Sequence, residues 1–203
     1  MAAANVDLQP GFADKVLSAQ STFRTVMEAM ARPGQVMPVA DEVGRPPSMM
    51  AGVAAIALTL LDQDTPLWLD PAFASAPDVG AWLRFHTGAP IVDRQDAASF
   101  ALIAESAMLP DLSSFALGTP EYPDRSTTLI LQVPSLSRGR TFHLRGPGIS
   151  RTTSLTVILE PADLFDRLSI NEQLFPRGID VILVDDRSLV AIPRTTRLAS
   201  AGA

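Results

Sequence analysis

The chain has 203 residues, 47% of them hydrophobic, which suffices to bury the core of one globular domain. Its net charge of −6 argues against a general nucleic-acid-binding protein, because affinity for phosphate backbones needs a basic surface. The absence of cysteine excludes disulfides, thiolate catalysis and thiolate metal sites, and fits a reducing compartment. No stretch reaches the roughly 18 apolar residues of a membrane span, so we expect a soluble, cytoplasmic protein.

The first predicted element is a long amphipathic helix. Residues 1–10 are small and polar, which predicts a loose tail with order beginning near Gly11. From Phe12 to Met30, apolar residues recur at spacings of three and four, which is typical of a helix with one buried face. The phrase RPG at Arg32 ends the pattern.

Short strands and helices alternate through the rest of the first half. The phrase QVMPV at 35–39 predicts an edge strand, because Pro38 cannot donate a hydrogen bond to a sheet. The run 48–61 is apolar nearly all round and predicts a buried helix. Further patterns predict strands at 66–69, within 87–92 and at 98–105, and helices at 76–86 and 109–118.

The second half contains mostly predicted strands. The β-rich runs 126–136 and 141–149 predict a hairpin with an arginine-rich loop. A strand at 154–160 precedes a helix at 161–175, where Pro161 suits the first turn. The phrase FPRGIDVILVDDRSLVAIPRTT, at 175–196, predicts two strands joined by an acidic turn.

These elements together predict an α/β fold. A mixed sheet with helices on both faces, a three-layer α/β/α sandwich, is the arrangement that this order of elements favours. We expect a single domain at 11–197, followed by a small frayed tail at 198–203.

Charge is distributed unevenly along the chain. Residues 1–124 hold 15 acidic and 6 basic residues, whereas residues 125–203 hold 7 acidic and 10 basic ones. The segment 125–159 contains no Asp or Glu but carries five arginines and His143. Fifteen of the sixteen basic residues are arginine, which suits bidentate contacts with carboxylates or phosphates, although a coding bias toward arginine also explains the enrichment.

Candidate residues for binding an anion or a partner follow from this distribution. Arg138, Arg140 and Arg145 lie in the acid-free segment, and Arg194, Thr195 and Thr196 follow the last predicted strand. Arg84 and His86 lie at the end of a predicted helix, where a histidine also commonly binds the last carbonyls. The ordinary alternative for all of them is a solvated surface residue.

No pattern of a standard active site is present. The chain has no GxxxxGK[ST], no GxGxxG and no GxSxG, and its two histidines lack the spacing of metal ligands. The acid pairs Asp62 with Asp64 and Asp185 with Asp186 fall at predicted turns, where Asp binds the local backbone. Lys15 is the only lysine and lies near a helix start, a poor place for a Schiff base. We therefore assign no catalytic residue and no metal ligand.

Several phrases together resemble the PhnH family of the bacterial carbon-phosphorus lyase system. They are FRTVMEAMARPG, LLDQDTPLWL, LRFHTGAP, LILQVPSLSRGRTFHLRGPGI and FPRGIDVILVDDRSLVAIPRTT, and they run in order through nearly the whole chain. The resemblance implies a cytoplasmic subunit that acts in phosphonate catabolism with the G, I and J proteins and, functionally, with an L protein.

The resemblance also implies a reaction and a fold. The assigned reaction displaces adenine from ATP with methylphosphonate and gives α-D-ribose 1-methylphosphonate 5-triphosphate. The implied fold is a three-layer α/β/α sandwich related to pyridoxal-phosphate transferases but without that cofactor, able to form a homodimer alone. No catalytic residue is carried over from the family.

Three functions fit these observations. The first is a subunit that is non-catalytic alone and completes a site for ATP and phosphonate by docking to partners. The second is a self-sufficient nucleotide- or phosphonate-binding enzyme with an arginine-rich anion site. The third is a metabolite-binding homodimer without chemistry. The missing motifs favour the first, because the second supplies no nucleophile, base or metal ligand.

Overall fold

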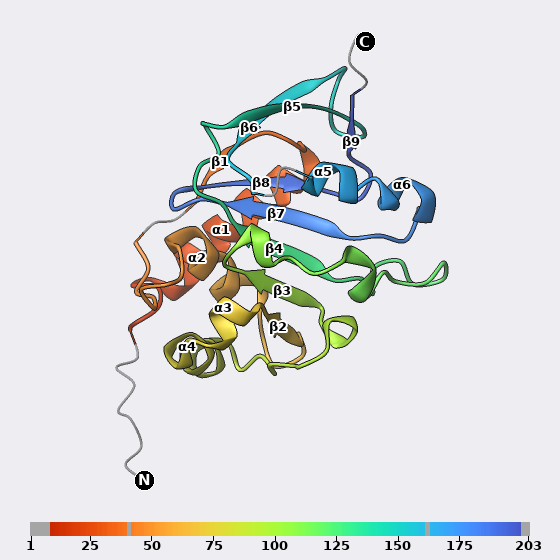
Figure 1. Cartoon of the computed structure of the whole chain (residues 1–203). Coiled ribbons are helices and arrows are strands. Elements are labelled where there is room, and N and C mark those ends of the chain that lie inside the picture. Colours follow the sequence, from red (N-terminus) through yellow and green to blue (C-terminus); the bar gives the residue numbers. More distant parts are fainter. Residues whose placement is uncertain (1–8, 40–41, 161–162, 200–203) are drawn as a thin grey trace.

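The computed structural model describes residues 9–39, 42–160 and 163–199, and its centre is a six-stranded mixed sheet (Figure 1). Its strands β2, β3, β4 and β7 are parallel, and β8 and β1 extend it in antiparallel fashion. The order across the sheet is β1 (Met37–Pro38), β8 (Ser188–Ile192), β7 (Asp180–Val184), β4 (Thr128–Gln132), β3 (Phe100–Ile103) and β2 (Leu67–Leu69).

The hairpin of β7 and β8 confirms the prediction for 175–196. Its strands pair from Val181 with Ile192 to Val184 with Leu189. Alternate residues of β7 enter two different apolar clusters, Ile182 and Val184 on one face and Val181 on the other. Both faces of the central sheet are therefore covered, which explains the nearly continuous apolar runs of its strands.

Four helices cover one face of the sheet. They are α1 (Lys15–Ala31), α2 (Ala51–Leu60), α3 (Pro71–Ala74) and α4 (Pro77–Thr87). The helix α2 is the predicted buried helix, and its residues 51–57 are all buried. The start of α1 is fixed by Asp14, whose carboxylate accepts hydrogen bonds from the backbone N–H groups of Val16 and Leu17.

The opposite face carries a small antiparallel sheet and two short helices. The sheet has the order β6 (Thr153–Val157), β5 (Arg140–Arg145) and β9 (Arg197–Leu198), and the helices are α5 (Leu164–Arg167) and α6 (Ile170–Leu174). Figure 1 shows β5, β6 and β9 at the top of the view, away from α2, α3 and α4, while the end of α1 reaches this layer, since a Cβ atom at Gly148 would collide with the Ala31 carbonyl oxygen. The mixed α/β sandwich is confirmed, with a small sheet forming much of its third layer. The likeness to pyridoxal-phosphate transferases stays a prediction.

The hairpin predicted from 126–136 and 141–149 is wrong. The strand β4 lies inside the large sheet between β3 and β7, whereas β5 pairs with β6 and β9. Burial explains the separation, because β4 is covered on both faces while β5 alternates between exposed and buried residues from Thr141 to Arg145. A strand covered on both faces and a strand with one solvated face belong in different layers.

Three other predicted elements are shorter in the structure. The helix predicted at 109–118 is a 3₁₀ turn at Leu112–Ser114, and the strand within 87–92 is a single bridge from Ile91 to Leu67. The helix predicted at 161–175 divides at Leu168 and Ser169, where the backbone forms tighter i to i+3 hydrogen bonds, while residues 161–162 lie outside the described part. Two further 3₁₀ turns are Gln95–Ala97 and Ser106–Met108.

The domain boundaries at 11 and 197 stay predictions. The loose tail predicted at 1–10 falls mostly on residues 1–8, and the tail predicted at 198–203 falls mostly on 200–203, both outside the described residues. Within the described part, Leu198 belongs to β9 and the Ala199 N–H donates to the His143 carbonyl.

Polar side chains bind helix starts at the carboxyl edge of the parallel strands. Gln132, at the end of β4, accepts a hydrogen bond from the Met50 N–H at 2.6 Å, and Asp186 accepts one from the Ala51 N–H at 3.2 Å. These groups satisfy N–H donors that the first turn of α2 leaves unpaired. Asp185 binds the N–H groups of its own turn, as predicted, whereas the prediction is wrong for Asp186, whose carboxylate binds the distant Ala51 N–H.

Asp70 has the same function at the end of β2 and is fully buried. Its carboxylate accepts hydrogen bonds from the N–H groups of Phe73 at 2.9 Å, Ala104 at 3.0 Å and Glu105 at 3.3 Å. Loss of hydration on burial raises the pKa of Asp70 above its ordinary 3.8, although these three hydrogen bonds act in the opposite direction. The Asp70 carboxylate therefore joins α3 to the segment after β3, and its burial without water around it costs free energy.

Replacing Asp70 with asparagine is expected to change how stability depends on pH. Because the folded-state pKa lies above 3.8, the folded chain holds this proton more tightly than the unfolded chain. Wild-type stability should therefore fall relative to Asp70→Asn as pH rises from 3.8 through the raised folded-state pKa. Urea denaturation of both proteins at a series of pH values measures the difference between their free energies of unfolding. The other titratable groups are the same in both proteins, so their contributions cancel in this difference. A wild type that gains stability over the variant with rising pH contradicts the prediction.

Candidate functional site

The structure distributes the eight predicted binding residues over four places. Arg84 and His86 lie on α4, and Arg138 and Arg140 lie at the start of β5. Arg145 lies at the other end of β5 and faces the segment of Thr195 and Thr196, whereas the side chain of Arg194 turns inward. The residues therefore do not converge on one surface, and each group is described by itself.

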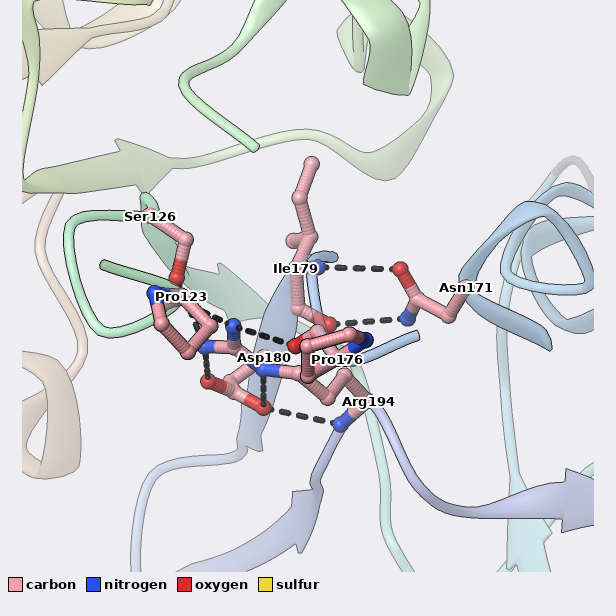
Figure 2. A network of polar contacts seen from close by, with 7 residues as sticks. All are labelled: Pro123, Ser126, Asn171, Pro176, Ile179, Asp180 and Arg194. Carbon is pink, nitrogen blue, oxygen red and sulfur yellow. Dashed lines mark hydrogen bonds and ion pairs between the residues drawn. The ribbon is translucent and has the colours of Figure 1, made fainter. Parts of the chain in front are cut away.

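The guanidinium of Arg194 is held by a network within the chain (Figure 2). It forms an ion pair with Asp180, and the side chains of the two residues are only 14% and 12% exposed. Its remaining donors reach the Ser126 hydroxyl at 2.6 Å and the backbone carbonyls of Pro123 at 2.5 Å and Pro176 at 3.5 Å. This arrangement favours a structural part for Arg194 over contact with a ligand.

A second pair of contacts continues this network. The Asn171 side-chain amide accepts a hydrogen bond from the Ile179 N–H and donates one to the Ile179 carbonyl, both at 2.9 Å. Figure 2 shows Asn171 beside the strand segment that carries Asp180. The two sets of contacts fix α6, the start of β7 and the end of β8 relative to one another.

Arg84 and His86 occupy the last turn of α4. Arg84 is exposed, and the His86 ring lies 4.7 Å from the Trp82 ring between centroids. The Nε2 atom of His86 and the Trp82 indole N–H both contact the Gln9 carbonyl at 2.9 Å. His86 therefore contacts the N-terminal segment instead of the last carbonyls of its own helix.

Arg138 and Arg140 are exposed at the loop that enters β5. Arg140 lies over the Phe142 ring, 4.9 Å from its centroid. No described residue forms an ion pair with Arg138. Both side chains remain candidates for contact with a partner.

Arg145 and Thr195 line a shallow depression of about 380 Å³ together with a residue that sequence reasoning missed, Arg197. We call it the basic depression, and its lining is Arg145, Gly146, Pro147, Phe175, Thr195 and Arg197. Arg145 and Arg197 are directly paired across β5 and β9. Its lining contains no acidic residue.

A smaller depression of about 190 Å³ adjoins it and shares Arg197. Glu172 lines this second depression and forms an ion pair with Arg197 at 3.0 Å, with both side chains about half exposed. Thr196 also lines it, and the buried Thr196 hydroxyl has no hydrogen-bond partner among the described residues. Polar groups left unpaired in this way cost about 1–3 kcal/mol and call for an explanation.

The carboxyl edge of the sheet offers a different chemistry. A depression of about 280 Å³ there is lined partly by Gln132, Glu105 and Glu160, and it carries no basic residue. Such a lining disfavours an anionic ligand. Within the described ranges, no cluster of three or more His, Asp or Glu side chains could hold a metal ion.

The outer face of α1 carries an uncovered apolar stripe. Val16, Phe23 and Met27 are 64%, 49% and 53% exposed and lie on one side of the helix, with Leu17 flanking them. Val16, Phe23 and Met27 belong to the periodic pattern that predicts a single buried face, and that part of the prediction is wrong. The buried face instead carries Thr22, Val26 and Ala29.

Comparison with known proteins decides the family. Residues 10–199 match the family model described as bacterial phosphonate metabolism protein (PhnH). The chain belongs to the PhnH family. This confirms the resemblance found in its sequence phrases, and the match spans almost all the residues that form the two layers around the sheet.

Two relatives of this family member carry curated names. The α-D-ribose 1-methylphosphonate 5-triphosphate synthase subunit PhnH of Rhizobium meliloti (strain 1021) is 42% identical over 189 residues, covering 92% of this chain and 93% of that protein. The putative C-P lyase subunit protein HtxG of Stutzerimonas stutzeri is 30% identical over 185 residues, covering 91% and 87%. Both relatives are named as subunits.

Replacing Arg194 with methionine is expected to destabilise the fold by about 3–5 kcal/mol, because it leaves the Asp180 carboxylate buried without its partner. Urea denaturation measures the loss. Arg138→Met is the matched control, since it removes the same charge from an exposed loop and should change stability by less than about 0.5 kcal/mol. Equal stability of the two variants contradicts the structural part assigned to Arg194.

Proposed function

We propose that this chain is a cytoplasmic subunit of the carbon-phosphorus lyase system in phosphonate catabolism. It acts with partner subunits in making α-D-ribose 1-methylphosphonate 5-triphosphate from ATP and methylphosphonate, with adenine displaced. The observation that carries the proposal is the match, over about nine tenths of the chain, to relatives that are named as subunits of such systems. The expected partners are the G, I and J proteins and, functionally, the L protein.

The polar groups of the fold support a subunit that is non-catalytic alone. Asp70, Gln132 and Asp186 bind the starts of helices, and Arg194 is occupied by Asp180. These groups are engaged in holding the fold, and among the described residues neither histidine is paired with a carboxylate that could orient it as a base. ATP is accordingly proposed as a substrate of the complex, and pyridoxal phosphate is not expected.

The apolar stripe of α1 supports docking to another subunit. Monomeric soluble proteins rarely leave several large apolar side chains exposed together, so this group marks an interaction surface, although the exposed Gln20 lies between Val16 and Phe23. From Val16 to Met27 the stripe extends about 16 Å along the helix, at 1.5 Å per residue. Exposed charged residues, among them Arg24 and Glu28, border it, which is the arrangement of an apolar interface centre with a polar rim. We assign this surface to a partner subunit of the synthase.

The isolated chain is expected to form a homodimer, which light scattering can measure. Phe23 lies on the α1 stripe. The molar mass of the Phe23→Gln variant in solution therefore shows whether the stripe forms the homodimer interface or binds a partner subunit. A variant that stays dimeric but loses partner subunits supports the proposed docking. A variant that becomes monomeric yet still binds its partners assigns the stripe to the homodimer instead.

Synthesis is expected only when the partners are present. The isolated chain, incubated with ATP and methylphosphonate, should release no adenine, because its described residues offer no paired acid and base to activate a nucleophile. Addition of the G, I and L proteins should start adenine release, which chromatography measures. Reactions without this chain serve as the control. Adenine release by the chain alone overturns the proposal and favours the self-sufficient enzyme.

Polar substitutions on the α1 stripe are expected to weaken assembly without unfolding the chain. Met27→Gln and Phe23→Gln remove apolar contacts from an exposed face, so thermal stability should change little, while partner affinity should fall by about tenfold or more. Met108→Gln is the matched control, because Met108 is similarly exposed at a different place. Co-purification with the partner subunits reports the binding, and equal binding by all three variants contradicts the assignment.

A further inference from the structure

The basic depression combines features that a phosphate ligand recognises. Arg145 and Arg197 are partners in the register of β5 and β9, so their Cβ atoms lie about 5 Å apart. Like charges placed directly opposite each other across a sheet destabilise it unless an anion offsets them. No described residue forms an ion pair with Arg145, so no carboxylate in the described part of the chain competes for its guanidinium.

Arg197 forms only a weak ion pair, with Glu172. Its ion pair with Glu172 is about half exposed on both sides, and such pairs contribute little to stability. Glu172 lies in the adjoining depression and is absent from the lining of the basic depression itself. An incoming phosphate can therefore compete with Glu172 for Arg197 while meeting Arg145 unopposed.

The backbone brings the two sides of the depression close together. At Gly146 a Cβ atom would lie 2.7 Å from the Thr195 carbonyl oxygen, and the φ angle of 146° is one that residues with side chains rarely adopt. Glycine at this position therefore permits the turn after β5 to approach the segment after β8. This approach places Thr195, a hydroxyl donor, next to the two arginines.

An aromatic side chain completes the lining. Phe175 follows α6 and is 60% exposed, although it is large and apolar. An exposed aromatic ring beside two guanidinium groups suits a ligand that carries both a planar base and a negatively charged group. The base can stack on the ring, and the charged group can bind the guanidinium groups. A nucleoside triphosphate has this combination of groups.

We propose that the basic depression binds the polyphosphate of a nucleoside triphosphate, with Arg145, Arg197 and Thr195 holding phosphate oxygens and Phe175 contacting the base. Guanidinium groups bind phosphate oxygens in bidentate fashion, which makes two neighbouring arginines a strong phosphate site. The assignment rests on the proposed function, in which ATP is a substrate of the complex. It adds that this chain contributes a part of the ATP site.

Calorimetric titration of the isolated chain with inorganic tripolyphosphate tests the assignment. Arg145→Met and Arg197→Met should each weaken tripolyphosphate binding about tenfold, the typical effect of losing one charge-assisted contact. Glu172→Gln should strengthen it, because the variant releases Arg197 from its competing carboxylate. Arg138→Met is the matched control, since Arg138 lies at the other end of β5, and should leave binding unchanged.

Comparison of three ligands distinguishes the contribution of the arginines from that of Phe175. ATP and tripolyphosphate should both bind more tightly than AMP, and Phe175→Ala should weaken ATP binding without affecting tripolyphosphate. Equal losses in Arg145→Met and Arg138→Met indicate a diffuse charge effect and overturn the assignment. Arginine variants that bind tripolyphosphate normally but lose a partner subunit overturn it as well, by making the depression a protein interface.

The experiments distinguish a failure of this inference from a failure of the proposed function on which it rests. A chain that binds no tripolyphosphate, yet is required for adenine release by the complex, overturns this inference and leaves the subunit role intact. Thermal denaturation of each variant shows that it is folded, and the gain of affinity expected for Glu172→Gln cannot arise from unfolding.

Discussion

The ion pair of Arg194 and Asp180 holds together the part of the molecule in which three chain segments meet. Asp180 begins β7, Arg194 follows β8, and the same guanidinium binds the loop of Pro123 and Ser126 before β4. Buried pairs of this kind contribute modest net stability but are costly to break from one side. The direction in which the chain leaves β8 depends on this pair, and with it the position of Thr195 and of β9.

The carboxyl edge and the amino edge of the large sheet carry different polar side chains. Ligands of open α/β sheets commonly lie at the carboxyl ends of the parallel strands. Here that edge is occupied by side chains that bind helix starts, and its depression is acidic. The basic depression lies instead beyond the end of β8, which is the amino edge because β8 runs antiparallel to β7.

The sequence predicts the fold better than it predicts the site. Apolar runs identify the buried strands around Ile130 and Ile182 and the buried helix α2, because burial on all sides leaves a continuous signal. Periodicity alone cannot say which face of α1 is covered, since both faces carry large apolar residues. Nor does any local signal join Arg194 to Asp180 or Arg145 to Arg197, because these contacts depend on where distant strands lie. The partner of β4 was missed for the same reason.

The exposed stripe of α1 also affects how the subunit behaves before it is assembled. A partner that binds only the folded chain shifts the folding equilibrium toward the folded state by mass action. The apparent stability of the chain therefore depends on the concentration of that partner. A chain made in excess of its partners would keep Phe23 and Met27 in water and remain open to self-association and proteolysis. If the stripe docks a partner subunit as proposed, balanced synthesis of the subunits limits the time that this face of α1 spends in water.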